Sequence, residues 1–253
     1  MELNLKGKVA LVTGGSRGIG AAICRGLAAE GVHVGFNYNQ NLPAATTLAD
    51  ELRNHYGVKV VAVQADVGEE ISVCRFIKAV DAELGPIDIL VNNAAYCPSG
   101  PATSYSIEEW EKTFAINVSG TFVASRELLK LWQERHVKGC IVNIASQAAF
   151  LGSTSGHLPY DSSKGAMISM TRALAREYGK AGIRINAVAP GLVKTEMVAA
   201  NLEKKLDAYL ARIPIYRIAE PEEIASVVTF LASDAASYIT GATIDATGGM
   251  IMH

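Results

Sequence analysis

The feature that most constrains the fold is a glycine-rich turn between a buried strand and a helix, near the start of this 253-residue chain. The run Lys8–Thr13 (KVALVT) is β-branched and apolar, as expected of a strand buried on both faces of a parallel sheet. It leads into Gly14–Gly20 (GGSRGIG), a helical stretch over Ala21–Glu30 and a second strand over Val32–Phe36. Strand, glycine turn, helix and strand in this order form a βαβ unit, which is right-handed by default.

The alternation of strands and helices continues along the whole chain. No linker, low-complexity tract or repeat divides it, so the pattern predicts a single NAD(P)-binding domain over residues 1–253. The expected fold is α/β, a Rossmann-type doubly wound parallel sheet of about seven strands flanked by helices, with ligands at the carboxyl ends of the strands. Further strands are predicted over 58–63, 87–91, 139–145, 183–189 and 242–246, and helices over 43–56, 69–84, 107–135, 159–178 and 221–232.

Composition and charge exclude several classes of protein. Hydrophobic residues make up 49% of the chain and charged residues 19%, which is ordinary for a soluble globular protein. The formal net charge of -2 offers no basic field to nucleic acid or to an anionic membrane, so neither partner is expected. No apolar run reaches transmembrane length and the first residues lack a signal-peptide core, so a cytoplasmic location is expected. The cysteines have no zinc-like spacing, so reduced thiols and no metal site are expected: Cys24, Cys74, Cys97 and Cys140.

A second motif lies at the start of the helix predicted over 159–178, where Tyr160 and Lys164 are four residues apart. Residues at i and i+4 project from one face of a helix. A nearby cation favours phenolate, so the pKa of Tyr160 is expected to fall from about 10 toward neutral. Such a tyrosine exchanges a proton at physiological pH, as carbonyl reduction and alcohol oxidation require. The pair alone is a weak signal, because chance can produce this spacing on a surface helix.

The glycine turn is predicted to bind the phosphates of a dinucleotide. Gly14, Gly18 and Gly20 allow close backbone approach, and the following helix offers free N–H groups and the positive end of its dipole. The second strand ends in FNYNQ, without the acidic residue that holds the adenosine ribose of NAD. Arg17 can reach a 2′-phosphate, so NADP(H) is favoured over NAD(H). Asp66, after the third strand, is interpreted as a turn or N-cap residue, as a contact to the adenine amino group, or as both.

In this order and spacing, the motifs closely resemble those of the short-chain dehydrogenase/reductase family, and the resemblance covers Lys8 to Gly249. The family's TGxxxGxG pattern lies at residues 13–20 and its NNAG pattern at Asn92–Ala95. Its Pro-Gly pair after the sixth strand is Pro190-Gly191. Ala95 stands where the family has glycine, and the added methyl is expected to crowd the backbone near the nicotinamide ribose.

The resemblance implies hydride transfer between a nicotinamide and a carbonyl, with Tyr160 as the proton donor. Lys164 would lower the tyrosine pKa and hold the nicotinamide ribose, and Ser146 would hydrogen-bond the substrate oxygen, with a turn serine as the alternative. Asn117 would kink its helix and hold a proton-relay water, with a surface asparagine as the alternative. Thr195 would touch the nicotinamide carboxamide, with a turn threonine as the alternative. The implied cofactor contacts are Gly14, Ser16, Arg17, Gly18, Ile19, Gly20, Asn37, Asn39, Asp66, Val67, Asn93, Ala94, Ala95, Tyr160, Lys164, Pro190, Gly191, Val193 and Thr195.

Three loops beyond the strand ends, 96–105, 147–158 and 192–213, are expected to form the substrate site. They are mostly apolar and have few charges, which favours a carbonyl compound with apolar surface. His157 is interpreted as a capping or pocket-lining residue rather than a catalytic base. The expected lining residues are Tyr96, Cys97, Phe150, Leu151, His157, Leu158, Leu192, Met197, Val198 and Leu202.

Within the family, the chain looks most similar to the 3-oxoacyl-(acyl-carrier-protein) reductases. A sugar, polyol or xenobiotic-ketone dehydrogenase is the alternative enzyme, and a catalytically silent cofactor-binding module is the non-enzyme alternative. Family members are usually tetramers built from the two long helices and the last strand, so a homotetramer is expected. A carrier protein is acidic and would require basic residues near the pocket mouth, unless these are only solvated charges. The candidates are Arg135, Lys138, Lys180 and Arg184.

Overall fold

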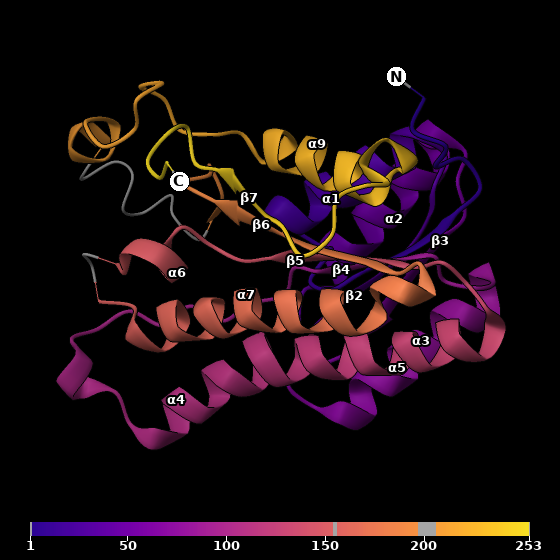
Figure 1. Ribbon diagram of the computed structural model, residues 1–253, viewed down its shortest axis with the longest axis horizontal. Helices are drawn as coiled ribbons and strands as arrows, with labels where there is room; N and C mark the ends of the chain where they lie inside the picture. Colours follow the sequence, from indigo (N-terminus) through magenta and orange to yellow (C-terminus); the bar gives the residue numbers. More distant parts are fainter. Residues whose placement is uncertain (1, 154–155, 197–205, 253) are drawn as a thin grey trace.

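A seven-stranded parallel sheet forms the centre of the molecule in the computed structural model, which describes residues 2–153, 156–196 and 206–252 (Figure 1). The strand order is β3-β2-β1-β4-β5-β6-β7. Each pair of neighbouring strands is parallel. This confirms the predicted Rossmann-type sheet. The strands are β1 (Val9–Val12), β2 (His33–Tyr38), β3 (Val60–Gln64), β4 (Ile89–Asn92), β5 (Cys140–Ile144), β6 (Arg184–Pro190) and β7 (Thr243–Ala246).

Helices cover both faces of the sheet, in two layers that Figure 1 shows above and below it. Each layer encloses a hydrophobic core of its own, so the strands between them are buried on both faces. The upper layer contains α1 (Gly18–Ala29), α2 (Leu42–Tyr56) and α9 (Pro221–Ala232). The lower layer contains α3 (Glu70–Leu84), α5 (Gly120–Arg135) and α7 (Leu158–Tyr178). In these ranges, no helix is both long and apolar enough to cross a membrane.

The strand order reverses between β1 and β4, and the loops that follow these two strands are joined there. Thr13 Oγ1 accepts hydrogen bonds from the N–H groups of Asn93 (2.9 Å) and Ala94 (3.0 Å). In return, Asn93 Nδ2 donates to the carbonyl oxygens of Thr13 (2.9 Å) and Gly14 (3.0 Å). A reversal of this kind opens a crevice at the carboxyl ends of the strands, where ligands of doubly wound sheets bind.

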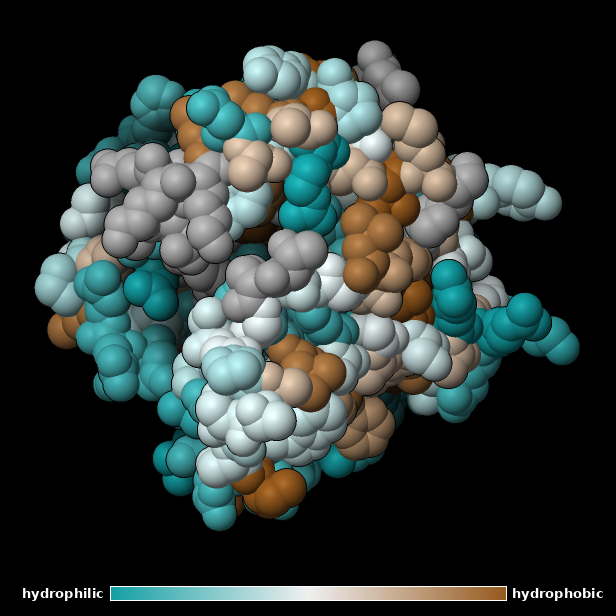
Figure 2. Space-filling view, turned by 90° about the vertical axis from the view of Figure 1, so that its left-hand side faces the viewer, coloured by the Kyte–Doolittle hydropathy of each residue, from teal (hydrophilic) through white to brown (hydrophobic). Residues whose placement is uncertain are grey.

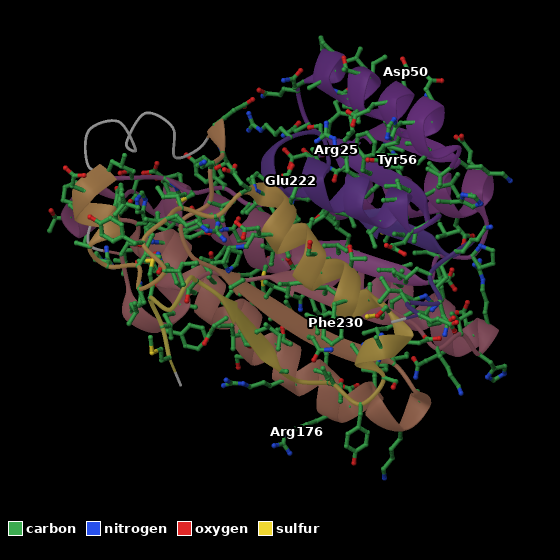
Figure 3. All side chains as sticks on the ribbon, turned by 90° about the horizontal axis from the view of Figure 1, so that it is seen from above. Arg25, Asp50, Tyr56, Arg176, Glu222 and Phe230 are labelled. Atoms are coloured by element: carbon green, nitrogen blue, oxygen red, sulfur yellow. The ribbon has the colours of Figure 1, made fainter. Side chains whose placement is uncertain are left out.

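Helix α1 is fixed on its outer side by α2 and α9. A Cβ on Gly26 would lie 3.1 Å from Thr229 Oγ1, so glycine at this position lets α1 and α9 pack closely. Arg25 lies between α2 and the start of α9 (Figure 3) and forms a two-pronged ion pair with Glu51, with both N–O distances 2.7 Å. The amino end of α1, which contains the glycine turn, is therefore held in place from two sides.

The helix predicted over 107–135 is interrupted around Asn117, where the family resemblance implied a kink. It consists of α4 (Ile107–Phe114), a π-helical segment (Ala115–Ser119) and α5. The N–H of Gly120 donates to Ala115 O, five residues earlier. A Cβ on Gly120 would lie 2.3 Å from Val67 O, so this glycine permits a close approach rather than weakening the helix. Single π turns inside helices are frequent at functional sites.

Candidate active site

The Tyr160–Lys164 pair lies in the first two turns of α7, beside the carboxyl end of β5. Lys164 is 1% exposed, and its Nζ donates a 2.6 Å hydrogen bond to Ile144 O. The same Nζ lies 5.5 Å from the centroid of the Tyr160 ring. Both side chains therefore lie on one face of the helix, turned toward the sheet. The chance-spacing interpretation is wrong, because a fully buried lysine is not part of a solvated surface.

The structure corrects the predicted pKa of Tyr160. Burial raises the pKa of this hydroxyl above its usual value, and Cys97 and Asp161 act in the same direction, whereas the hydrogen bond with Ser146 lowers it. Burial also lowers the pKa of Lys164 to about 8, so the cation expected to favour phenolate is itself destabilised. The expectation of a pKa near neutral is therefore wrong for this structure, in which Tyr160 holds its proton.

Ser146 follows β5 and faces the hydroxyl of Tyr160. It is 9% exposed, and it hydrogen-bonds Tyr160. Its Oγ also accepts a 3.1 Å hydrogen bond from the N–H of Ala148, at the start of the short helix α6 (Ala148–Leu151). The turn-serine interpretation and the catalytic one are thus compatible. Two hydroxyl groups converge at this point, where both can hydrogen-bond one substrate oxygen.

Asn117 is fully buried within the π-helical segment, so the surface interpretation is wrong. Its Nδ2 donates to Tyr96 O and to Ser163 Oγ, each at 2.9 Å. Its Oδ1 accepts from the N–H of Tyr96 at 2.8 Å. The side chain is therefore occupied by protein groups, and it joins the loop after β4 to helix α7.

The amino end of α1 fits a pyrophosphate. Gly14 and Gly18 have φ angles of +65° and +53°, which favour glycine. In the described chain, α1 has no side-chain cap from its N-cap residue Arg17 and no acidic residue in its first turn. Its first N–H groups can therefore bind an anion. A Cβ built on Gly18 would lie 3.4 Å from Thr195 Cγ2, so the Pro190–Thr195 loop borders the same turn.

The ends of β2 and β3 lie beside this turn, and the residues there have different roles. Asn37 Oδ1 accepts from the N–H of Gly14 (2.8 Å) and its Nδ2 donates to Ala65 O (2.8 Å), so the side chain braces the glycine turn against β3. Asp66 forms the predicted turn, because its Oδ1 accepts from the N–H of Gly68 at 2.8 Å. The other carboxylate oxygen of Asp66 lies 3.3 Å from Nδ2 of the exposed Asn39. Asn39 and Asp66 remain candidates for contact with an adenosine.

Ala95 is accommodated without backbone strain. Among the described non-glycine residues, a positive φ occurs only at Asn4, His136 and Tyr216. The crowding expected between its methyl group and the backbone near the nicotinamide ribose stays a prediction.

On the other side of the crevice, a Cβ on Gly191 would lie 2.9 Å from Thr247 Cα, so glycine lets the end of β6 approach the end of β7.

The first two predicted substrate loops are tied to each other. The carbonyl of Gly156 accepts from the N–H of Gly100 (2.9 Å) and from the hydroxyl of Tyr105 (2.8 Å). His157 Nδ1 donates to Pro98 O at 2.7 Å, which assigns the proton to this nitrogen. The histidine thus joins the two loops, in agreement with the capping interpretation. Cys97 Sγ lies 3.7 Å from the same Nδ1, and burial raises the pKa of its thiol to about 11.

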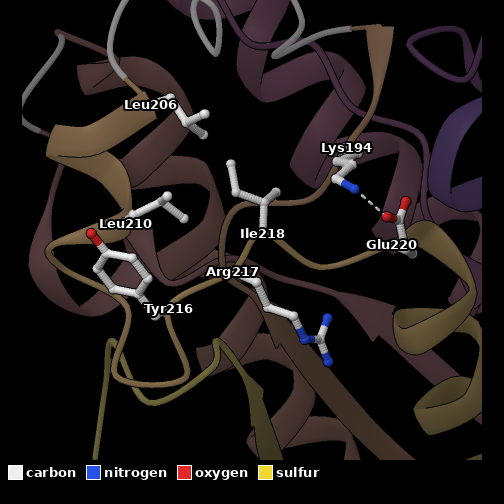
Figure 4. Close-up of a pocket in the computed structure, with 7 residues that line it drawn as sticks. All are labelled: Lys194, Leu206, Leu210, Tyr216, Arg217, Ile218 and Glu220. Atoms are coloured by element: carbon white, nitrogen blue, oxygen red, sulfur yellow. Dashed lines mark hydrogen bonds and ion pairs between the residues drawn. The ribbon is translucent and has the colours of Figure 1, made fainter.

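The third loop borders a separate cavity of about 290 Å³, which opens at the carboxyl edge of the sheet (Figure 4). The molecular surface is hollowed on this side, and apolar side chains border the hollow (Figure 2). An ion pair between Lys194 and Glu220 closes one side of the cavity. Three of the predicted lining residues, Met197, Val198 and Leu202, lie outside the described residues. The cavity is lined by Lys194, Leu206, Leu210, Tyr216, Arg217, Ile218 and Glu220.

The four basic residues proposed near the pocket mouth lie elsewhere. Arg184 begins β6, and its guanidinium donates to carbonyl oxygens at the end of α9, including Leu231 O at 2.7 Å. Arg135 ends α5 and forms an ion pair with Asp81. Lys138 precedes β5 and Lys180 follows α7, so all four lie at the amino edge of the sheet within one chain. The prediction is wrong because parallel strands place their two ends on opposite edges.

Sequence reasoning did not single out several residues that shape the site. Ser163 was visible inside the Tyr160–Lys164 motif, but its partner is 46 residues away. Tyr105 and Asp161 gave no local signal. Asp161 accepts hydrogen bonds from both the N–H (2.6 Å) and the hydroxyl (2.7 Å) of Ser153.

The fold and this arrangement define a Rossmann-type oxidoreductase, and known proteins identify its family. The family model described as "Enoyl-(Acyl carrier protein) reductase" matches residues 14–251. The chain is 39% identical to a 3-oxoacyl-[acyl-carrier-protein] reductase of Aquifex aeolicus, over 99% of this chain and 100% of that protein. It is 42% identical to an acetoacetyl-CoA reductase of Rhizobium meliloti, over 96% of this chain and 98% of that protein.

A solved structure agrees with these relatives. A blue fluorescent protein from a metagenomic library, in complex with NADPH, matches with a TM-score of 0.92 at 38% identity, covering 98% of this chain and 100% of that one. The chain belongs to the short-chain dehydrogenase/reductase family of oxidoreductases. The family resemblance drawn from the sequence motifs is therefore confirmed.

Proposed function

We propose that the protein reduces a carbonyl to a secondary alcohol with NADPH, or catalyses the reverse reaction. The observation that supports this most directly is the meeting of the Ser146 and Tyr160 hydroxyls above the buried Lys164, at the same edge of the sheet as the glycine turn. When bound, the nicotinamide supplies the hydride.

The protein's own groups supply the proton and the electrostatic stabilisation. Burial keeps Tyr160 protonated, which suits a proton donor in the reducing direction. As hydride reaches the carbonyl carbon, negative charge grows on the oxygen, and the Ser146 hydroxyl stabilises it by a hydrogen bond. Lys164, held by Ile144 O, would bind the nicotinamide ribose and replace the proton lost by Tyr160, a role that its pKa of about 8 permits.

We propose a 3-oxoacyl thioester as the substrate. Support comes from the apolar loops around Tyr160 and from two relatives whose names specify a 3-oxoacyl-[acyl-carrier-protein] and acetoacetyl-CoA. Attachment of the acyl group to a carrier protein is part of this proposal. So does a homotetramer, which would cover exposed apolar side chains such as Phe122 on α5 and Met252 near the carboxyl end, 44% and 75% exposed.

The test is a comparison of Tyr160→Phe with wild type, using NADPH and a panel that contains acetoacetyl-CoA, a sugar ketone and an aromatic ketone. We expect kcat with acetoacetyl-CoA to fall by about 1,000-fold, because general acid catalysis typically contributes a factor of this order. The Kd of NADPH is expected to stay unchanged. Tyr238→Phe, at a fully exposed tyrosine, is the matched control and should keep wild-type turnover.

Each component of the proposal has its own contradicting result. Wild-type kcat in Tyr160→Phe would exclude the tyrosine as proton donor. Turnover of a sugar ketone but not of acetoacetyl-CoA would exclude the thioester substrate. NADPH binding without turnover of any panel member would favour the cofactor-binding module instead.

A further inference from the structure

Ser163, which precedes Lys164 in α7, is buried and hydrogen-bonded on two sides. Its side chain is fully inaccessible to solvent. Its Oγ accepts a 2.9 Å hydrogen bond from Asn117 Nδ2 and donates a 2.6 Å hydrogen bond to the carbonyl oxygen of Tyr160. One hydroxyl therefore joins the π-helical segment to the turn of α7 that presents the tyrosine.

The same hydroxyl is the last link of a chain through three separate segments. Asn117 holds both backbone polar groups of Tyr96, in the loop after β4. It holds Ser163 with its remaining N–H. Because Asn117 donates to Ser163, the serine must direct its own proton elsewhere, and the Tyr160 carbonyl is the acceptor in reach. The direction of every hydrogen bond in the chain is thereby fixed.

We propose that Ser163 is a positioning residue for proton transfer, acting through Tyr160 and contacting neither substrate nor cofactor. A serine bonded to the carbonyl of an earlier turn adjusts the local path of a helix. Here that adjustment sets the backbone position of Tyr160, and therefore the position of its hydroxyl relative to Ser146. The inference rests on the proposed function, since it requires Tyr160 to be the proton donor.

The effect expected on removing the hydroxyl is on turnover rather than on binding. In Ser163→Ala, one Asn117 N–H loses its buried partner and the Tyr160 carbonyl loses its side-chain donor. A displacement of a reacting group by about 1 Å can cost about 100-fold in rate. We therefore expect kcat to fall by about 10- to 100-fold, with KM for the ketone and Kd for NADPH within about twofold of wild type.

The experiment compares Ser163→Ala, Ser163→Thr and Ser162→Ala in steady-state reduction of acetoacetyl-CoA and in NADPH binding followed by fluorescence. Ser162 is the neighbouring, partly exposed serine, and its alanine variant should match wild type. The threonine keeps the hydroxyl and should recover kcat to within about threefold. A solvent deuterium isotope effect on kcat should increase in Ser163→Ala, because proton transfer becomes slower, which a loss of folding alone would not produce.

The double variant Ser163→Ala/Tyr160→Phe separates this inference from the proposed function. If the serine acts through the tyrosine, the double variant is no slower than Tyr160→Phe alone. Wild-type kcat in Ser163→Ala, together with an inactive Tyr160→Phe, would overturn the positioning role and leave the function intact. An equal fall in kcat and NADPH affinity would overturn it as well. If Ser163→Ala does not fold, Ser163→Cys replaces it, and wild-type kcat in that weak donor would count against the role.

Discussion

The two halves of the site are built in different ways. The cofactor half comprises β1, the glycine turn and α1. Its important features are backbone N–H groups and glycines, whose lack of a side chain allows close approach. In the catalytic half, around β4, β5 and α7, the important groups are buried polar side chains that come from distant segments. The geometry of the cofactor half is set by the backbone conformation, and the geometry of the catalytic half is set by hydrogen bonds between side chains.

The catalytic half extends into the sheet as a buried polar network. Asn92 Nδ2 donates to Asn143 Oδ1 at 2.9 Å, across neighbouring strands. Asn143 Nδ2 donates in turn to Thr171 Oγ1 on α7 at 2.8 Å. Among the described residues Asn92 Oδ1 has no hydrogen-bond partner, but the amide N–H groups link the two strands and the helix in one directed chain. Buried polar chains of this kind favour one arrangement over its alternatives. They explain how α7, with Tyr160 and Lys164, is held in register with β5.

The comparison predicts that the cofactor half is intolerant of a single added methyl group. A Cβ on Gly20 would lie 2.1 Å from Gly14 O, and neither backbone can move away without opening the turn. In Gly20→Ala we expect a loss of about 3 kcal/mol in the free energy of unfolding, measured with urea. We also expect about 100-fold weaker NADPH binding, measured by fluorescence titration, because the N–H groups that bind phosphate are displaced.

Gly179→Ala is the matched control, because an added Cβ there meets no atom within 4 Å and φ is -58°. It should bind NADPH as wild type does and be equally or slightly more stable. Tight NADPH binding by Gly20→Ala would contradict the view that backbone shape defines this half.

The same difference explains what the sequence could predict. The glycine turn, β1 and α1 are contiguous, so the periodicity of a few residues and the spacing of Gly14, Gly18 and Gly20 are enough to predict them. Only the boundary changed, since α1 begins at Gly18 and its first turn includes Gly20. The side of the crevice on which Asn117 and Ser163 meet depends on a contact between residues 46 apart, which no local pattern contains.

Burial was the property that sequence reasoning could not supply. The Tyr160–Lys164 spacing correctly predicts that the two side chains share a face of α7. It does not show that the hydroxyl and the ammonium group both lose solvation, a loss that outweighs the attraction expected between them. For the same reason the predicted direction of the tyrosine pKa shift was wrong, whereas the shared helix face was confirmed.

The catalytic half should show its burial as a pH dependence of stability. The pKa of Lys164 falls from 10.5 to about 8 on burial, so between these values the unfolded chain binds one more proton than the folded chain. The free energy of unfolding of wild type should therefore rise from pH 8 to pH 10.5 relative to that of Lys164→Met. The relative rise is expected to be about 2 to 3 kcal/mol.

Urea unfolding of both proteins across this pH range, without cofactor, measures the difference. The methionine variant removes the titrating group and keeps most of the side-chain volume. Contributions of groups remote from Lys164 cancel in the subtraction. Cys97 interacts electrostatically with Lys164, so both proteins carry Cys97→Ser in this comparison. A constant difference between the two proteins would mean that Lys164 keeps its ordinary pKa in the folded chain.

The smallest expected effect concerns Arg17, the one charged side chain of the glycine turn. Arg17 is exposed, and its guanidinium lies 3.7 Å from the carboxylate of Glu196, a loose pair that leaves it able to turn toward a 2′-phosphate. In Arg17→Ala we expect kcat/KM for NADPH to fall by about 10-fold, since one charge-assisted contact is lost. The value for NADH should change by less than about twofold.

Glu196→Gln sharpens the comparison, because it removes the competing carboxylate and keeps the size of the side chain. Its preference for NADPH over NADH should equal or exceed that of wild type. An equal loss for both cofactors in Arg17→Ala would mean that the arginine contacts the pyrophosphate that they share. Selectivity would then have to come from Asn39 and the end of β2, and the glycine turn would be governed by backbone shape even at its one charged residue.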